Sequence, residues 1–434
     1  MSQQRRALVL GAYGLIGAAC VRALDNAGFE VVGMGRSAAS AQAANLPVQW
    51  EICDITTLTV AQWQEMLRDV DVVVNAAGAL QDGARDNLEA IHVTAIANLT
   101  EAIGDLPVRL VQISAAGVSE TAPTAFFRSK ARGDALVSDR LSDWVILQPT
   151  LVLAREAYGG TALLRAIASI PLVQPQVLAD APVQTVALDD VAEAVVRAAT
   201  GDIPARTTAT LTEAGVQSFA ELTSQVRAWL GLPPARWRPV VPGWMIRLSS
   251  CGADLLGHLG WRSPLRRSAL RSLEAGIRGD PGSWIAAGGG PCRSLADTLN
   301  AQPATRQDRM FARVYLLLPL AIATLSLFWI LSGIIPFFDY AGTVSILTER
   351  GVAPWASTLA VIGGAVLDIV LGAALLWRPW VRRAALGMVA LSLSYLLGSV
   401  VAAPDLWLDP LGPMIKVFPG MVLAGFVWLV VEAR

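Results

Sequence analysis

The 434-residue chain is 54% hydrophobic and only 16% charged, with a formal net charge of −1. A typical soluble domain is about 25% charged, so the composition indicates a mixture of soluble and membrane parts. The length predicts two or three folded units. The near-zero net charge argues against nucleic-acid binding, which requires a basic stripe. Four scattered cysteines without a CxxC pair, and only two histidines, argue against a metal site.

The charged residues are concentrated in the first 310 positions, whereas residues 314–432 consist of long apolar runs. The sequence therefore predicts an α/β domain followed by an all-α transmembrane domain. The expected division is a nucleotide-binding domain over 1–300 (core 1–200, substrate- or membrane-facing segments 201–300), a linker over 301–313 and four transmembrane helices over 314–434.

A short apolar run, Arg6–Leu10, is the first predicted strand. Gly11, Gly14 and Gly17 follow at GxxGxxG spacing and lead into a helical pattern. The first glycine permits a tight turn, the second lets the backbone approach a pyrophosphate, and the third lets the helix pack closely. Free N–H groups at the helix start would bind the phosphates. We therefore predict a dinucleotide site with further contacts from Tyr13, Leu15 and Ile16, against the alternative of an ordinary glycine-rich turn.

A second predicted strand, Phe29–Met34, leads into Gly35-Arg36-Ser37, where Arg36 and Ser37 are candidate cofactor contacts. An NAD-selective protein places Asp or Glu at this strand end, where it binds the ribose hydroxyls. Arg36 instead offers a guanidinium that suits a 2′-phosphate. The sequence therefore favours NADP(H), with NAD(H) as the alternative. A competing interpretation is that Arg36 stacks on adenine or is merely solvated.

Three further strands are predicted, over Val48–Cys53, Val70–Val74 and Arg109–Ile113. Strands that alternate with helices imply a doubly wound parallel sheet of the Rossmann type, with the ligand at the carboxyl ends of the strands. The residues that follow these strands are therefore candidate cofactor contacts: Asp54 and Ile55 near the adenine, then Ala76, Ala77 and Gly78 near the adenosine ribose.

The pieces GAYGLIG, CDI, NAAG, ISAAG, FFRSKARGDALV, DWVILQPTLVLA and VQTVALDDVAEAVV cover roughly residues 6–200. In this order they resemble the short-chain dehydrogenase/reductase superfamily. They are most similar to its atypical branch, which includes the nucleotide-binding accessory subunit of respiratory complex I. The resemblance implies an NAD(P)-binding Rossmann domain and adds Lys130 and Pro149 to the cofactor contacts.

Active members of this superfamily carry a Tyr-x-x-x-Lys helix, in which Lys holds the nicotinamide ribose and lowers the tyrosine pKa. Lys130 fits this motif, but Phe126 stands at the tyrosine position. Ser114 lies where the substrate-polarising serine often occurs, so Ser114 and Lys130 are the candidate catalytic residues. A replacement proton donor would be Ser114, His92, Tyr158 or water. The competing interpretations are a structural role for His92 and a simple loop aromatic at Tyr158.

Residues 236–285 are rich in tryptophan and arginine. Such a mixture is typical of a surface that rests on lipid headgroups, and an ordinary substrate lobe is the alternative.

Four apolar stretches of about 20 residues follow, the length needed to cross a bilayer: Val314–Pro336, Ser357–Trp377, Ala384–Ala402 and Met414–Val431. Arginines precede the first and join the second to the third, which places both termini in the cytoplasm. We therefore expect a four-span protein of the inner (cytoplasmic) membrane. The helix number and the glycine-rich second helix, GGAVLDIVLGAALLW, resemble the DoxX-like family of four-helix membrane proteins.

Asp368 is the one acidic residue deep in a predicted span. Because burial of a carboxylate in lipid is costly, it should face the bundle interior. It is either a proton site or polar contact for a quinone-like ligand, or an interhelical hydrogen bond to Ser392, Ser394 or Tyr395.

Three functions are considered, of which the third, a membrane protein whose soluble part has lost its ligand, is opposed by the intact Gly11, Gly14, Gly17, Asp54 and Lys130. The first is a membrane-anchored NAD(P)(H)-dependent oxidoreductase that acts on a lipophilic substrate such as a quinone or isoprenoid. The second is a non-catalytic NAD(P)-binding scaffold or assembly subunit of a membrane redox complex. In both, the expected partners are the lipid bilayer and a lipophilic small molecule or a membrane redox protein, without nucleic acid and without a metal.

Overall fold

The computed structural model describes residues 4–83, 86–261, 263 and 265–431. The chain forms two compact units, which are described separately. The first contains the chain up to Cys251 together with Ser263–Arg309, and the second contains Gly252–Arg262 and the chain from Met310 onward. The division falls inside two helices, α9 (Gly243–His258) and α13 (Arg306–Ile334).

The first unit is built on a seven-stranded sheet with the order β10-β6-β5-β4-β1-β2-β3, in which all neighbours are parallel. The chain runs from β1 outward to β3 in one direction and from β4 outward to β6 in the other. The order therefore reverses between β1 and β4, and this is the switch point at which such sheets bind ligands. The predicted doubly wound parallel sheet is confirmed. The strands are β1 Arg6–Leu10, β2 Glu30–Gly35, β3 Gln49–Ile52, β4 Val72–Asn75, β5 Arg109–Ile113, β6 Trp144–Pro149 and β10 Thr207–Leu211.

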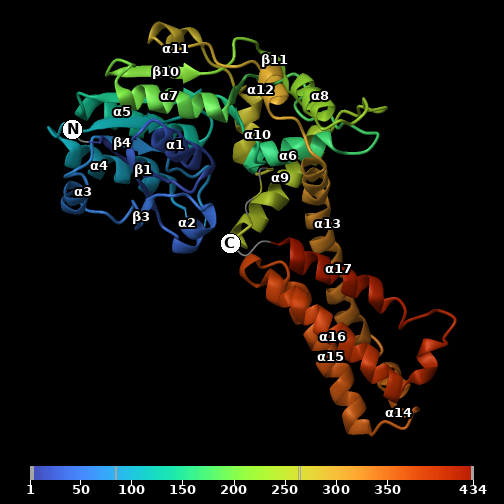
Figure 1. The fold of residues 1–434 in the computed structure, drawn as a ribbon. Helices are drawn as coiled ribbons and strands as arrows, with labels where there is room; N and C mark the ends of the chain where they lie inside the picture. The colour runs from blue at the N-terminus through green and yellow to red at the C-terminus, as the bar shows by residue number, and fades with distance from the viewer. Residues whose placement is uncertain (1–3, 84–85, 262, 264, 432–434) are drawn as a thin grey trace. The chain divides into compact units, whose positions relative to one another are not determined.

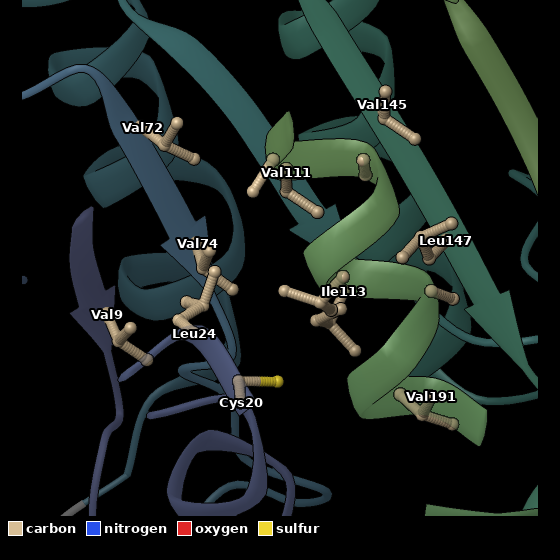
Figure 2. Close-up of a cluster of buried hydrophobic side chains, with 14 of the residues drawn as sticks. Val9, Cys20, Leu24, Val72, Val74, Val111, Ile113, Val145, Leu147 and Val191 are labelled. Atoms are coloured by element: carbon tan, nitrogen blue, oxygen red, sulfur yellow. The ribbon is translucent and has the colours of Figure 1, made fainter. Parts of the chain in front are cut away.

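Helices cover both faces of this sheet (Figure 1). Helices α1 (Leu15–Asn26) and α7 (Leu188–Thr200) pack side by side on one face, and Figure 2 shows the buried cluster beneath them. Helices α3 (Val60–Met66), α4 (Ala95–Ile103) and α5 (Ala125–Arg140) cover the other face. In β1, Val9 belongs to the first cluster and Leu8 and Leu10 to the second. Both side-chain directions are therefore buried, and this explains why the strand is apolar throughout.

The first unit also contains further short helices and two small two-stranded sheets, β11-β8 and β7-β9. In chain order the elements are α2 Ala38–Ala44, η1 Ala90–Thr94, β7 Leu151–Leu153, α6 Gly159–Ala168, β8 Pro182–Val183, β9 Thr185–Ala187, β11 Gln217–Ser218, α8 Phe219–Trp229, α10 Arg267–Glu274, α11 Gly282–Ala286 and α12 Leu295–Ala301.

The second unit is helical. Among the described residues, three helices are long and apolar enough to cross a membrane: Arg306–Phe337, Pro354–Ala374 and Arg378–Ala402. The fourth predicted span contains α17 (Val417–Val430), a 14-residue apolar helix. Four spans therefore stay a prediction. The other helices are α14 Tyr340–Thr348, α15 Pro354–Ala374 and α16 Val381–Ala402, with short turns η2 Ile335–Phe337, η3 Arg378–Trp380 and η4 Pro404–Trp407.

Helices α13 and α15 approach at backbone distance because small residues line their contact. A Cβ added to Gly333 would lie 2.4 Å from the Ala365 carbonyl oxygen, and one added to Gly372 would lie 3.0 Å from the Ser326 carbonyl oxygen. The Ser326 hydroxyl also donates to the Gly372 carbonyl at 2.8 Å. Close packing of this kind is what holds helices together where lipid removes the hydrophobic drive.

Candidate functional site

The turn between β1 and α1 depends on its glycines. Gly11 has a φ of +71°, and a Cβ there would lie 2.8 Å from the Ala77 Cα, so the turn packs directly against the loop after β4. A Cβ at Gly17 would lie 2.2 Å from the Gly11 carbonyl oxygen, which ties the start of the helix to the turn. At Gly14, by contrast, a Cβ would meet only the Gly11 carbonyl oxygen, at 3.1 Å. The backbone there is open to a ligand.

This turn fits the pyrophosphate of a dinucleotide. Gly14 is the N-cap of α1 and provides no side-chain cap, and the first turn holds no acidic residue. The N–H groups of Leu15, Ile16 and Gly17 therefore have no intrahelical acceptor and lie at the positive end of the helix dipole. Oxygens of a bound phosphate are the acceptors that such a helix start favours.

The end of β2 presents an aromatic platform and an ion pair. The Tyr13 ring covers Gly35, where a Cβ would lie 2.3 Å from Tyr13 Cε1, and it stacks on Trp50 with ring centroids 6.2 Å apart. Next to it, Arg36 Nη2 lies 2.5 Å from Asp86 Oδ1. Arg36, which the sequence predicted to bind a 2′-phosphate, is thus paired with the Asp86 carboxylate from the loop after β4.

The other predicted contacts near the adenosine end have local roles in the structure. Asp54 Oδ1 accepts hydrogen bonds from the backbone N–H and the hydroxyl of Thr56, at 3.0 and 2.8 Å. The Ile55 side chain is buried in the core. Ser37 caps α2 by accepting a hydrogen bond from the Ser40 N–H at 3.2 Å. Their contacts with a cofactor stay predictions.

Ser114, Lys130 and Asp134 form a buried polar cluster at the carboxyl end of β5. Lys130 Nζ donates to the Ile113 carbonyl oxygen at 2.8 Å, and the Ser114 hydroxyl donates to the Asp134 carboxylate. Asp134 stands one helical turn after Lys130 on α5, and the Gln112 side chain interacts with the same carboxyl group. The two catalytic candidates are therefore brought together, with an acidic residue between them.

Burial shifts both charged members of this cluster toward their neutral forms. Burial lowers the pKa of Lys130, and the nearby Asp134 charge opposes this shift. Burial raises the pKa of Asp134, against the effects of Lys130 and of the hydrogen bonds from Ser114 and Gln112. A carboxyl group whose pKa is raised in this way is suited to hold a proton.

His92 lies in the π-helical segment η1, next to the cluster, and both of its ring nitrogens are engaged. Nε2 accepts the Ala79 N–H at 3.3 Å, so the proton resides on Nδ1, which lies 2.8 Å from Ser129 Oγ. Ser129 in turn donates to the Phe126 carbonyl at 3.0 Å. Burial and then the Lys130 charge lower the His92 pKa to about 3. The ring is neutral and satisfied within the fold, which supports the structural interpretation over the proton donor.

Phe126 occupies the position from which a tyrosine hydroxyl would act. Lys130 Nζ lies 5.8 Å from the centre of its ring, and the His92 ring meets it edge-on at 5.7 Å. The apolar ring makes a cation–π contact with Lys130 but has no proton to exchange. Tyr158, the other candidate donor, is 47% exposed at the N-cap of α6.

The loops after β4 and β6 lie at the same edge of the sheet as the glycine turn. A Cβ at Gly78 would lie 3.4 Å from His92 Nε2 and 4.0 Å from Lys130 Nζ. Pro149 ends β6, and its carbonyl accepts the Ala116 N–H at 2.9 Å. Together with Ala76 and Ala77, these residues lie at or just after the carboxyl ends of the central strands, and their contacts with a cofactor stay predictions.

Two residues of the site, Asp134 and Asp86, were missed by the sequence reasoning. Asp134 had a local signal, because it follows Lys130 by four positions and therefore shares its helix face. Asp86 had no local sequence signal, since it lies in a loop, 50 residues from its partner Arg36. Among the described residues, no group of three His, Cys, Asp or Glu side chains is placed to hold a metal ion.

In the second unit, Asp368 on α15 is buried and bound by its neighbours. Tyr395 Oη on α16 donates to Asp368 Oδ1 at 2.9 Å, and the Ser332 side chain on α13 interacts with the same carboxyl group. Gly364 makes room for this pair, because a Cβ there would lie 2.9 Å from the Tyr395 hydroxyl. Of the three partners considered from the sequence, Tyr395 is the one found; Ser394 instead donates to the Leu391 carbonyl.

Comparisons with protein families match each unit separately. Residues 7–133 match the NAD dependent epimerase/dehydratase family, and residues 326–425 match the DoxX-like family. A comparison with curated proteins gives no match.

Several solved structures share the fold of the first unit. WbmG of Bordetella bronchiseptica in complex with NAD is 17% identical with a TM-score of 0.52, and the match covers 69% of this chain and 93% of WbmG. MoeE5 in complex with UDP-glucose and NAD is 17% identical with a TM-score of 0.50, covering 72% and 99%. A putative epimerase from Burkholderia cenocepacia J2315 is 20% identical with a TM-score of 0.50, covering 71% and 98%. These similarities establish the Rossmann-type architecture.

Proposed function

Since an NAD-dependent epimerase/dehydratase-like domain and a DoxX-like membrane domain are joined in this one chain, we propose that it is a membrane-anchored oxidoreductase. It uses a nicotinamide nucleotide, with a preference for NADP(H), to reduce a lipophilic substrate such as a quinone or isoprenoid. The observation that carries the proposal is the glycine turn at the switch point of the sheet, together with Ser114 and the buried Lys130 amino group at the end of β5.

The cofactor assignment has support at both ends of the proposed nucleotide site. The uncapped start of α1 suits the pyrophosphate, and the structural neighbours WbmG and MoeE5 are described in complex with NAD. Lys130 on α5 would hold the nicotinamide ribose, since its Nζ would lie 4.0 Å from a Cβ at Gly78. Arg36 supports the preference for NADP(H), because a guanidinium binds a phosphate in a bidentate, charge-assisted manner.

The chain offers a proton donor in place of the missing tyrosine. A bound nicotinamide nucleotide supplies the hydride, and the protein must supply the proton. When Asp134 is neutral, its O–H donates to Ser114 Oγ, which frees the serine hydroxyl to donate to a substrate oxygen. The proton then passes from the Asp134 carboxyl through Ser114 to that oxygen, and Lys130 stabilises the carboxylate that remains.

The membrane domain gives the choice of substrate a physical reason. A site tied to the bilayer meets lipid-soluble molecules at high effective concentration. Within the membrane domain, Asp368 and Tyr395 form a polar pair of the kind that contacts a quinone head group or holds helices together.

The test is NADPH oxidation by membranes that contain the protein, with short-chain quinones as acceptors. We expect Asp134→Asn to lower turnover by about 100-fold, because general acid catalysis contributes 10²–10⁴-fold, while NADPH binding persists. Asp139→Asn, an exposed carboxylate on the same helix, is the matched control and should keep full activity. Equal turnover in the two variants would exclude the Asp134–Ser114 route.

Phe126 favours a second candidate function, a scaffold that binds the nucleotide without turning it over. A scaffold would bind NADPH in the same assay and oxidise none of it with any quinone, in wild type and variants alike.

A further inference from the structure

We propose that Asp86 is a second determinant of nucleotide selectivity, one that opposes Arg36 and keeps NAD(H) bound in a site otherwise biased to NADP(H). The inference rests on the proposed function, because it concerns the nucleotide that the same proposed site binds. It extends that function by naming a carboxylate, from a different loop, that competes with the 2′-phosphate for one guanidinium.

The geometry places Asp86 at the adenosine ribose. In a sheet of this order, the residue that follows β2 reaches the 2′ position of the ribose, and Arg36 follows Gly35 directly. Asp86 Oδ1 lies 2.5 Å from Arg36 Nη2, so its carboxylate lies at the same position. Backbone hydrogen bonds between Gly83 and Asp86, at 2.9 and 3.3 Å, hold the Asp86 backbone in place.

The Asp86 carboxylate is more shielded than its partner. Its side chain is 14% exposed, whereas that of Arg36 is 36% exposed. Charges shielded from water interact more strongly than charges on an open surface. The charge of Asp54 also acts on the Arg36 guanidinium, so Asp86 is not the only carboxylate that opposes a phosphate there.

The two nucleotides experience this pair in opposite ways. The 2′-phosphate of NADP(H) carries about −2 charge units and must displace Asp86 from Arg36 or lie beside a like charge. The 2′-hydroxyl of NAD(H) is neutral and donates a hydrogen bond to the carboxylate, which leaves the Arg36–Asp86 pair intact. Asp86 therefore reduces the difference in affinity by which Arg36 favours NADP(H) over NAD(H).

The experiment titrates NADPH and NADH into the full-length protein in detergent and follows the fluorescence of the bound reduced nucleotide. Asp86→Asn keeps the size of the side chain and removes its charge. We expect the ratio of the NADH to the NADPH dissociation constant to rise about tenfold or more, since one like charge is removed within a few ångströms of the phosphate. Most of the change should come from tighter NADPH binding.

Glu89→Gln is the matched control. It removes the same charge three residues away, where Glu89 pairs with Arg132 on the surface, 2.5 Å apart. Its nucleotide ratio should equal that of wild type, which separates a local effect of Asp86 from a general change in charge.

The possible outcomes are distinct. A wild-type protein that binds both nucleotides, with an unchanged ratio in Asp86→Asn, overturns the role of Asp86 and leaves the proposed function standing. A wild-type protein that binds neither nucleotide at millimolar concentration overturns both. A ratio that rises in Asp86→Asn and not in Glu89→Gln supports the inference. If Asp86→Asn does not fold, Asp86→Glu is the second variant, because it keeps the charge on a longer side chain. Asp86→Glu should retain both the fold and the wild-type ratio of the NADH to the NADPH dissociation constant. A tenfold rise of that ratio in Asp86→Glu would contradict the inference.

Discussion

The buried His92 makes the stability of the first unit depend on pH in a way that a single substitution should remove. The fold lowers the pKa of His92 from 6.5 to about 3, first through burial and then through the Lys130 charge. A folded pKa below the unfolded one means that the unfolded chain takes up a proton first as the pH falls. The stabilisation is therefore complete above pH 6.5 and is lost progressively between pH 6.5 and pH 3.

The size of the effect follows from the shift. Each pH unit in this window costs about 1.4 kcal/mol for one proton. A fall from pH 6.5 to 5.0 should remove about 2 kcal/mol of unfolding free energy through His92 alone. In a unit of about 300 residues such a loss lowers the Tm by about 3 °C.

The assay is thermal unfolding of the full-length protein in detergent at a series of pH values, followed by near-ultraviolet circular dichroism. His92→Asn places a group that does not titrate at this position. The Tm of this variant should therefore change less between pH 6.5 and 5.0 than the Tm of wild type, and the difference should equal the shift assigned to His92. The other histidine of the chain, the exposed His258, supplies the control, and His258→Asn should behave like wild type. If the Tm of wild type and the Tm of His92→Asn changed in parallel with pH, the assignment of His92 as a buried neutral imidazole would be wrong.

Two further predictions concern close packing and the membrane unit. Gly133→Ala should destabilise the first unit by at least about 1–3 kcal/mol, because the added Cβ would lie 2.2 Å from the His92 carbonyl oxygen. Gly160→Ala is the control, since a Cβ there meets open space, and it should be neutral or stabilising in the same thermal assay. Tyr395→Phe removes the hydroxyl that binds Asp368 and should lower the resistance of the membrane unit to sodium dodecyl sulfate by about 1 kcal/mol. Unchanged unfolding curves would argue against these contacts.

The sequence alone was enough for the architecture, because the relevant signals are local. A strand buried on both faces must be apolar throughout, and a βα turn around a pyrophosphate needs glycine at fixed spacing. These requirements identified β1, the turn at Gly11, Gly14 and Gly17, and the doubly wound sheet. The lengths of the apolar runs likewise predicted four long apolar helices, and among the described residues three helices are long and apolar enough to cross a membrane.

The partners of the polar side chains were decided by the tertiary structure. Arg36 was identified from its place after a strand, but Asp86, 50 residues later, reaches it only because two loops end at the same edge of the sheet. Ser114 was identified in the same way, and its bond to Asp134 depends on how α5 packs across β5. Hydrogen bonds and ion pairs act over a few ångströms, so their presence depends on packing between distant segments and not on the pattern within any one of them.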